Sequence, residues 1–238
     1  MISGILSANQ VAMATADVQH ATLDEVASKA WLARHGIAVP RSAVVADASA
    51  IDQAIANLCA PFALKVIAQG VSHKSDVGGV ALRLADADAL RAAMRSMRDA
   101  TGLRDAAIRG FLIEEMAPRG HEMIIGGVND RAFGPVVMLG MGGVFVEIFG
   151  DVAFRVCPIA RSDAYDMLAS LKAAPLLAGA RGGVVAAIEP LIDTLMAIGG
   201  EHGLLVREAA WIDELDINPV IASDKAAVAV DARIVRRT

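Results

Sequence analysis

The sequence has few cysteines and few aromatic side chains, and each shortage excludes a class of protein. Its two cysteines, Cys59 and Cys157, lie far apart without the close spacing of a metal site, so they indicate a reduced setting, and we expect a cytoplasmic protein. Aromatic residues make up 4% of the chain, and the net charge is −5. With no aromatic interleaving to stack bases and no basic excess to neutralise phosphates, we expect no nucleic-acid partner.

Long apolar runs are also missing. Although 55% of the residues are hydrophobic, no window of about 18 residues is free of both charge and clustered glycine, so we expect no membrane association. The first six residues lack the basic start and the long apolar run of a signal peptide. A chain of 238 residues can bury one large core or two smaller ones.

A polar loop between two apolar segments is the first feature with functional chemistry. The segments, residues 62–67 and 80–84, predict two strands. The loop between them carries a histidine, a lysine, a serine, an aspartate and two glycines: His73, Lys74, Ser75, Asp76, Gly78 and Gly79. Glycine amides that approach an anion, with Lys65 and Lys74 supplying positive charge, are typical of a phosphate cover. The alternative is an ordinary hairpin with a solvated tip.

Local patterns predict both helices and strands along the chain. Thr22 and Glu25 form a capping box that predicts a helix start, and Gly36 predicts the end of this helix. Further helices are predicted over residues 51–58, 86–100, 162–171 and 184–198, and further strands over 42–45, 111–116, 121–128, 135–139 and 144–148. The spacing indicates an N-terminal arm (1–21), a first lobe (22–116) and a second lobe (117–238).

Oxygen-bearing side chains alternate with apolar ones near the C-terminus. Glu214, Asp216 and Asn218 therefore lie on one face of a predicted strand. Asp231 ends the partner strand, and a short hairpin brings it beside Asn218. Carboxylate and amide oxygens on a rigid platform suit Mg²⁺, which substrate phosphates usually complete. The alternative is an edge strand with a polar outer face.

Two acids end the predicted strand over residues 111–116. Glu114, Glu115 and Met116 can present backbone groups and a carboxylate to a base and a ribose, although two acids at a strand end are also typical of a solvated surface. Glu122, on the following strand, faces the same cleft if the two lobes meet there.

The glycine-rich run over residues 140–143 suggests a dinucleotide loop, but two features exclude it. The third glycine of that motif is replaced by Phe145, and residues 144–148 continue as a strand where a helix should begin. Gly142 and Gly143 can still cover phosphates in a turn between strands. A tight hairpin turn is the alternative.

Together these residues resemble a known family. From about residue 22 to residue 235 the chain is similar to the ATP-grasp subunit of the nucleoside-diphosphate-forming acyl-CoA synthetases, in particular the β subunit of ADP-forming acetyl-CoA synthetase. A more distant resemblance is to the β subunit of succinyl-CoA synthetase. The segments that carry the match are 64–66, 73–80, 114–116, 140–144, 179–182 and 214–219. The His-Lys-Ser-Asp block at 73–76 is the most specific of them.

The resemblance implies an α+β protein with an ATP-grasp fold, in which two α/β lobes hold the nucleotide between them. It implies that Lys65 contacts the phosphates of ATP or ADP, that residues 114–116 hold the adenine, and that Glu122 lies near the ribose and phosphates. We place Lys74 and the glycines of the two loops in the same nucleotide site.

The resemblance also implies the metal and catalytic residues. Asn218 and Asp231 are expected to bind Mg²⁺ with Asp216 close by, and we place Asp216 among the metal ligands and the catalytic residues. His73 is expected to relay a phosphoryl group between ATP and a histidine of a CoA-binding α subunit. A neutral imidazole can attack phosphorus and leave again.

The implied reaction interconverts acyl-CoA, ADP and phosphate with a carboxylic acid, CoA and ATP. Because the chain contains the ATP-grasp part alone, we expect a CoA-binding partner in a hetero-oligomer. Two alternatives remain. An ATP-grasp ligase that joins a carboxylate to an amine needs no phosphohistidine, so His73→Ala would leave its activity intact. A nucleotide-binding scaffold would show no Mg²⁺-dependent phosphoryl transfer.

Overall fold

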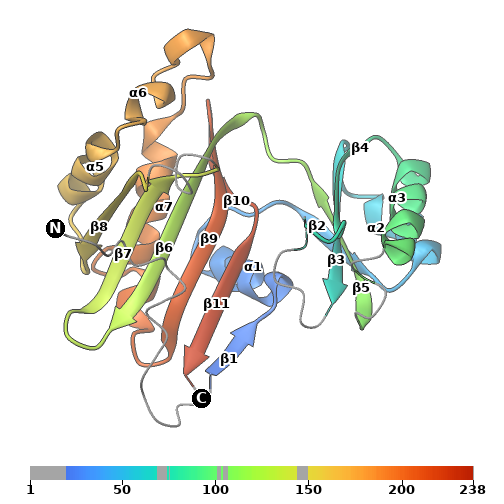
Figure 1. Cartoon of the computed structure of the whole chain (residues 1–238), viewed down its shortest axis with the longest axis horizontal. Coiled ribbons are helices and arrows are strands. Elements are labelled where there is room, and N and C mark those ends of the chain that lie inside the picture. The colour runs from blue at the N-terminus through green and yellow to red at the C-terminus, as the bar shows by residue number, and fades with distance from the viewer. Residues whose placement is uncertain are drawn as a thin grey trace, which may run out of the picture.

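Two antiparallel sheets organise the chain in the computed structural model (Figure 1), which describes residues 20–68, 74, 76–100, 103, 107–143 and 150–237. The small sheet has the strand order β2-β5-β3-β4. The large sheet has the order β1-β11-β9-β6-β7-β8, with β10 paired to β9. Residues 1–19 of the predicted arm (1–21), His73 and the predicted strand over 144–148 lie outside the described residues.

The small sheet and its helices come from one continuous part of the chain. Its elements are β2 (Ser42–Val45), η1 (Ala48–Ala50), α2 (Ile51–Ile55), β3 (Phe62–Ala68), β4 (Val80–Leu84), α3 (Ala87–Asp99) and β5 (Ile108–Glu115). Helix α3 begins after Asp86, whose side chain accepts a hydrogen bond from Ala89 N at 2.9 Å. Its apolar positions at helical spacing, Leu90, Met94 and Met97, are buried against the sheet, as the sequence period predicts.

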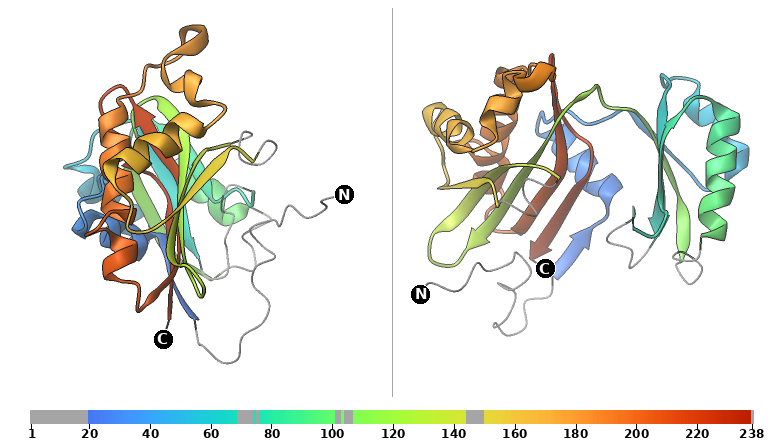
Figure 2. Two further views of the ribbon diagram at one scale, coloured as in Figure 1. Left: turned by 90° about the vertical axis from the view of Figure 1, so that its left-hand side faces the viewer. Right: turned by 45° about the horizontal axis from the view of Figure 1, so that its top comes forward.

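The large sheet carries most of the remaining elements. These are β1 (His20–Leu23), α1 (Glu25–Arg34), β6 (Gly120–Asp130), β7 (Gly134–Met141), β8 (Val152–Val156), α5 (Arg161–Ser170), α6 (Ala174–Leu177), η3 (Ala180–Gly182), α7 (Ile188–Gly199), α8 (Leu204–Arg207), β9 (Ile212–Ser223), β10 (Ala227–Ala229) and β11 (Ala232–Arg237). Helices α5 and α7 cover one face of this sheet (Figure 2). Buried Ile125, Leu139 and Ile217 form the core beneath them.

The first helix starts later than the capping box predicts. Residues 20–23 form strand β1, which pairs with β11 at the other end of the chain. Asp24 is the N-cap of α1, and its carboxylate accepts a hydrogen bond from Ala27 N at 2.9 Å. The predicted roles of Thr22 and Glu25 as caps are therefore wrong, because a strand contact that local sequence does not reveal occupies Thr22. The predicted end of the helix at residues 35–36 is confirmed.

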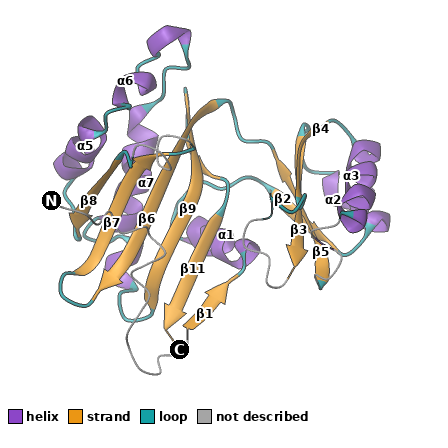
Figure 3. Cartoon of the chain, viewed as in Figure 1, coloured by secondary structure: helices purple, strands orange, loops and turns teal. Residues whose placement is uncertain are grey.

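The small sheet and the large sheet stand apart, at the right and the left of the view in Figure 3. The change from one to the other, between β5 and β6, falls near residue 117, where the sequence places the start of a second lobe. Strand β1 spans the end of the predicted arm and the start of the predicted first lobe, and helix α1 belongs to that lobe. Both pack with the large sheet, because β1 pairs with β11 and Leu32 of α1 is part of its core. The domain boundaries themselves remain a prediction.

Two other helices begin at positions different from those predicted. Helix α5 starts at Arg161 rather than after a cap at Ser162, and Asp163 reaches back to accept a hydrogen bond from Ala160 N at 2.7 Å. Helix α7 starts at Ile188 rather than near residue 184, which places Pro190 in its first turn, where the ring is tolerated. Among the described residues, no helix is long and apolar enough to cross a membrane.

Candidate nucleotide site

Strand β3 carries a buried lysine toward the large sheet. Lys65 is 5% exposed, and its neighbours on β3 are apolar and buried. The Lys65 Nζ atom donates to Glu25 Oε1 at 2.6 Å and to the backbone oxygen of Val230 at 2.9 Å. It also lies 3.0 Å from Glu114 Oε2, an ion pair that lacks hydrogen-bond geometry. Lys65 therefore connects the small sheet to groups on the large-sheet side.

Helix α1 brings two charged residues to the same place. Glu25 and Lys29 are one turn apart, and Lys29 Nζ donates to Glu25 Oε1 at 2.7 Å. Lys29 also donates to the carboxylate of Glu114 and, at 3.1 Å, to the backbone oxygen of Val230. Lys29 thus shares all three of its partners with Lys65. Sequence reasoning missed both α1 residues, because an acid and a lysine four apart on a helix usually indicate a solvated pair.

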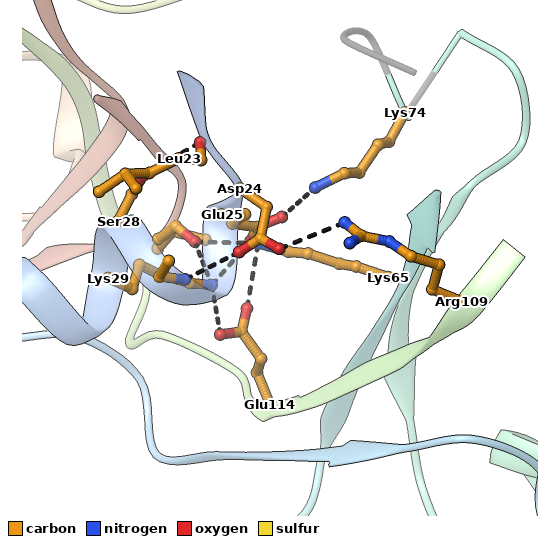
Figure 4. A network of polar contacts seen from close by, with 11 residues as sticks. Leu23, Asp24, Glu25, Ser28, Lys29, Lys65, Lys74, Arg109 and Glu114 are labelled. Carbon is orange, nitrogen blue, oxygen red and sulfur yellow. Dashed lines mark hydrogen bonds and ion pairs between the residues drawn. The ribbon is translucent and has the colours of Figure 1, made fainter. Parts of the chain in front are cut away.

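Lys74 and Glu114 complete the cluster (Figure 4). The ammonium group of Lys74, from the loop after β3, pairs with Glu25 Oε2. Glu114 is 1% exposed, so it is not the solvated strand-end acid that the alternative interpretation expected. We call Glu25, Lys29, Lys65, Lys74 and Glu114 the lysine–glutamate cluster. It joins the small sheet to α1 and the large sheet.

The opposite charges of this cluster keep one another ionised. Burial by itself would raise the pKa of Glu25, but the ammonium groups of Lys65, Lys29 and Lys74 outweigh it and lower that pKa to about 2. Burial would lower the pKa of Lys65, whereas Glu25, Glu114 and Asp231 together raise it above its ordinary value. Both groups are therefore charged at neutral pH. The cluster thus places three ammonium groups against two carboxylates.

The predicted metal ligands lie next to this cluster. Asn218 and Asp231 are neighbours on adjacent segments, and Asn218 N donates to the backbone oxygen of Asp231 at 3.2 Å. Asp216 is on the same strand, two residues before Asn218. Burial raises the pKa of both Asp216 and Asp231, and the carboxylate of Asp231 adds to the effect on Asp216. Bringing a cation to these carboxylates would offset that cost.

The donor set fits Mg²⁺ in its usual incomplete form. In the described part of the chain, no group of three or more His, Cys, Asp or Glu side chains is arranged to hold a metal ion. Asn218 is exposed, and Asp231 lies beside it. Oxygens from Asn218, Asp231 and Asp216 would leave the other coordination positions to water and phosphate, which Mg²⁺ commonly uses. These residues are therefore suited to a cation that arrives with a nucleotide.

The glycines of the first loop are needed for its backbone geometry. Gly78 has a φ of +74°, which favours glycine, and Gly79 N donates to Lys74 O at 2.7 Å. A Cβ atom on Gly79 would lie 2.7 Å from Val66 Cγ1, so this backbone packs directly on β3. The glycines thus fix the turn that carries Lys74. Whether they also contact phosphates stays a prediction.

The second glycine pair lies beside Glu122. Gly142 N donates to the backbone oxygen of Glu122 at 2.7 Å, and a Cβ atom on Gly142 would lie 3.0 Å from that oxygen. A Cβ atom on Gly143 would lie 3.8 Å from Glu122 Oε2. The structure therefore brings together the predicted residues at 122, 142 and 143.

Glu115 and Met116 are engaged elsewhere. The carboxylate of Glu115 accepts a hydrogen bond from Cys59 N at 2.8 Å and lies 3.1 Å from Arg41 Nη1. The amides of Glu115 and Met116 donate to the backbone oxygens of Arg41 and Pro61, each at 3.0 Å. Neither amide is free to bind a base. Their part in nucleotide binding stays a prediction that rests on other atoms of the segment.

A shallow hollow elsewhere is lined almost entirely by apolar side chains. It lies on α5, α6 and the start of α7, between Leu168, Leu177, Val185 and Ile188. Tyr165 is its polar exception, and the hydroxyl of this residue donates to Glu189. The hollow offers no cationic group for a phosphate, so we locate the candidate site at the lysine–glutamate cluster instead.

Comparison with known proteins identifies the family of this chain. A family model described as an ATP-grasp domain matches residues 14–235. The chain belongs to the ATP-grasp family. It is 39% identical over 222 residues to the β subunit of ADP-forming acetate–CoA ligase I from Pyrococcus furiosus, and the match covers 92% of this chain and 94% of that subunit. The family resemblance inferred from the sequence is thereby confirmed.

Solved structures of similar ATP-grasp proteins have the same fold. One is the dinucleotide-forming acetyl-coenzyme A synthetase 1 from Ca. Korarchaeum cryptofilum, in complex with coenzyme A, Ca-AMPCP and HgCl⁺ (TM-score 0.83, 39% identity, 91% of this chain and 93% of that chain). Another structure of that enzyme holds coenzyme A and Mg-AMPPCP, with a phosphohistidine segment that points towards the nucleotide binding site (TM-score 0.75, 38% identity, the same shares). Some relatives are longer, and the match covers 25% of ADP-forming acetate–CoA ligase I from Archaeoglobus fulgidus.

Proposed function

We propose that this chain is the nucleotide-binding, phosphoryl-transferring subunit of an ADP-forming acyl-CoA synthetase. The observation that carries the proposal is the buried lysine–glutamate cluster beside Asp231, in a chain that matches 94% of a named β subunit of such an enzyme. The reaction interconverts acyl-CoA, ADP and phosphate with a carboxylic acid, CoA and ATP.

The chemistry of phosphoryl transfer suits the charges of this site. Such a transfer requires positioning and charge neutralisation more than covalent assistance from the protein. We assign Lys65 and Lys74 to the phosphates of the nucleotide, and Asn218, Asp231 and Asp216 to Mg²⁺. A bound Mg²⁺ would neutralise charge on the phosphate oxygens. The structures of the Korarchaeum enzyme with Ca-AMPCP and Mg-AMPPCP support this assignment.

His73 is the residue that we assign to the covalent step. In the direction of ATP synthesis, an imidazole nitrogen of His73 attacks the phosphorus of a phosphohistidine on the partner, whose nitrogen–phosphorus bond breaks. An oxygen of the β-phosphate of ADP then attacks the phosphorus on His73, which gives ATP and the free imidazole. The phosphohistidine segment of the Korarchaeum enzyme, which points towards the nucleotide binding site, supports such a relay.

A partner chain is needed for the complete reaction. The similar Pyrococcus protein is named a β subunit, which supports a multi-subunit enzyme for this chain as well. We propose that the partner is a CoA-binding α subunit, because the Korarchaeum structures contain coenzyme A. We further propose a cytoplasmic location, since Cys59 and Cys157 are both free thiols.

Thermal unfolding with and without Mg²⁺·ADP tests the nucleotide site. At a ligand concentration one hundred times Kd, binding adds about 2.7 kcal/mol, or roughly 5 to 10 °C in Tm for a chain of this size. The Mg²⁺-dependent part of the shift should disappear in Asn218→Ala and persist in Asp224→Ala, which removes an exposed turn residue of the same hairpin. An equal shift in Asn218→Ala would contradict the metal assignment.

Phosphoryl labelling tests the relay. Incubated with γ-labelled ATP and Mg²⁺, the chain together with its CoA-binding partner should acquire a label that is stable in base and lost in acid. In His73→Ala, the label should be absent from this chain. Nucleotide binding with full acyl-CoA synthetase activity in His73→Ala would rule out the relay, and nucleotide binding without any phosphoryl transfer would favour a scaffold.

A further inference from the structure

The two carboxylate oxygens of Glu25 accept hydrogen bonds from different lysines (Figure 4). Oε1 accepts hydrogen bonds from Lys65 at 2.6 Å and from Lys29 at 2.7 Å. Oε2 pairs with Lys74 instead. Glu25 comes from α1, whereas Lys65 and Lys74 come from β3 and the loop after it. One carboxylate thus holds ammonium groups that we assign to the phosphates.

The three lysines differ in the contacts that would remain to them if the Glu25 carboxylate were removed. Lys65 and Lys29 each also contact Glu114 and a backbone carbonyl group, and their side chains are 6% exposed. Among the described residues, Glu25 is the ion-pair partner of the Lys74 side chain, which is 16% exposed, and the buried carboxyl group of Asp231 interacts with Lys74 through charge alone. The Glu25–Lys74 pair is therefore the most open to exchange.

We propose that Glu25 is an internal counter-ion of the nucleotide site, which holds Lys74 while the site is empty and releases it to the phosphates of the nucleotide. The inference rests on the proposed function, because it takes Lys74 as a phosphate ligand. An ammonium group offers a phosphate oxygen the same charge and the same donors that it offers a carboxylate. Glu25 is thus a positioning residue that competes with the ligand.

The competition has two physical parts. Lys74 must give up its pair with Glu25 before it can donate fully to a phosphate. The buried carboxylate then stays close to the bound phosphates and repels them, and this repulsion is strong where water is excluded. In the empty site the same carboxylate balances the buried ammonium groups, which would otherwise repel one another. Glu25 therefore stabilises the empty site and lowers its affinity for nucleotide.

The substitution Glu25→Gln distinguishes the roles of the two carboxylate oxygens. Its amide oxygen can still accept from Lys65 and Lys29, which are donors alone. Its NH₂ group then replaces Oε2 and cannot accept a hydrogen bond from Lys74. The variant keeps the shape of the side chain, removes its charge and frees Lys74.

Isothermal titration of the full chain with Mg²⁺·ADP, and separately with inorganic tripolyphosphate, tests the inference. We expect Glu25→Gln to bind both ligands more tightly, by about fivefold or more, from the removal of one nearby negative charge. Its Tm without ligand should fall, and the rise in Tm on adding Mg²⁺·ADP should exceed that of the wild type. A purely structural Glu25 would lower the Tm without tightening binding.

Two controls make the comparison specific. Asp24→Asn removes an acid one position away that pairs with Arg109 at 3.4 Å on the surface, and asparagine still caps the helix. This variant should bind Mg²⁺·ADP within about twofold of the wild type, because its charge is solvated. In a Lys74→Met background, Glu25→Gln should tighten binding less than it does in the wild-type background, because the competition for Lys74 is gone and only the repulsion of the phosphates by Glu25 remains to be relieved.

The outcomes distinguish this inference from the proposed function. Binding of Mg²⁺·ADP by the wild type, with equal or weaker binding by Glu25→Gln, would overturn the counter-ion role and leave the proposed function intact. Absence of nucleotide binding in both would overturn both. If Glu25→Gln does not fold, Glu25→Asp keeps the charge but shortens its reach to Lys74. That variant should also bind more tightly than the wild type, and equal or weaker binding would reject the inference.

Discussion

The Nζ atom of Lys65 lies 2.6 Å from Oε1 of Glu25, although the two residues are 40 positions apart and belong to elements that pack in different sheets. Lys65 is on the small sheet, and Glu25 opens the helix that packs with the large sheet. This contact makes the candidate nucleotide site part of the junction between the two sheets. Substitutions there should therefore alter both ligand affinity and stability.

Lys65→Met should weaken both properties. The substitution removes hydrogen bonds to Glu25 and to the Val230 carbonyl group, so we expect a loss of about 1.5 to 3 kcal/mol in the free energy of unfolding. Affinity for Mg²⁺·ADP should fall about tenfold or more, because a charged donor to phosphate is lost. Lys225→Met, an exposed lysine in a turn, serves as the control. Urea unfolding and isothermal titration measure the two effects, and unchanged affinity would contradict the phosphate assignment.

The stabilisation that Glu25 contributes should disappear in acid. The folded chain lowers the pKa of Glu25 from an ordinary 4.5 to about 2. A carboxyl group with a lowered pKa stabilises the folded state fully above its unfolded pKa, and the contribution is lost as the pH falls toward the folded value. The lowering corresponds to at most about 3 kcal/mol.

Urea unfolding from pH 7 to pH 2 checks this. The difference in free energy of unfolding between the wild type and Glu25→Gln should be constant above about pH 5.5 and shrink steadily toward pH 2. The same difference between the wild type and Asp24→Asn should be small throughout, because that acid is exposed. A difference that grows in acid would mean that Glu25 is not held as a charged group.

Local sequence patterns predicted the parts of the site that are close in sequence. Asn218 and Asp231 meet because a short hairpin joins them, and alternation placed Asp216 on the same strand. Strands β2 and β4 have the predicted bounds for the same reason. Such contacts follow from period and turn chemistry, which nearby residues determine.

The local sequence patterns did not reveal the contacts between segments that lie far apart in the chain. The capping box at Thr22 and Glu25 is a valid local pattern, but β1 pairs with β11 and moves the helix start to Asp24. That shift turns Glu25 from an expected cap into the centre of a charge cluster. Lys29 follows one turn later and was missed with it. Only the ion pairs from α1 to Lys65 on β3 and to Glu114 on β5 give these residues their role.

The N-cap assignment itself can be tested by paired substitutions. Asp24→Ala removes the hydrogen bond to Ala27 N and should cost about 1 kcal/mol in the free energy of unfolding. Thr22→Ala, in a strand before the helix, should cost less than about 0.5 kcal/mol if its hydroxyl caps nothing. Urea unfolding of both variants decides the question, and a larger loss in Thr22→Ala would restore the capping box.

Gly79→Ala should disturb the site through the backbone. A Cβ atom there would lie 2.7 Å from Val66 Cγ1 and 3.0 Å from Lys74 O, so the loop must move away from β3. Overpacking of this kind costs about 1 to 3 kcal/mol in the free energy of unfolding. Because the Gly79 amide bonds to Lys74 O at 2.7 Å, the shift would carry Lys74 with it and weaken binding of Mg²⁺·ADP.

Gly126→Ala is the matched control for Gly79→Ala. Its Cβ atom would lie 3.1 Å from Met138 Cε, the end of a flexible side chain that can turn aside. We expect a smaller loss of stability and unchanged affinity for Mg²⁺·ADP. If Gly79→Ala lowers the Tm but binds nucleotide as the wild type does, the position of this turn does not control Lys74. If both variants lose affinity alike, general destabilisation rather than displacement of Lys74 is the cause.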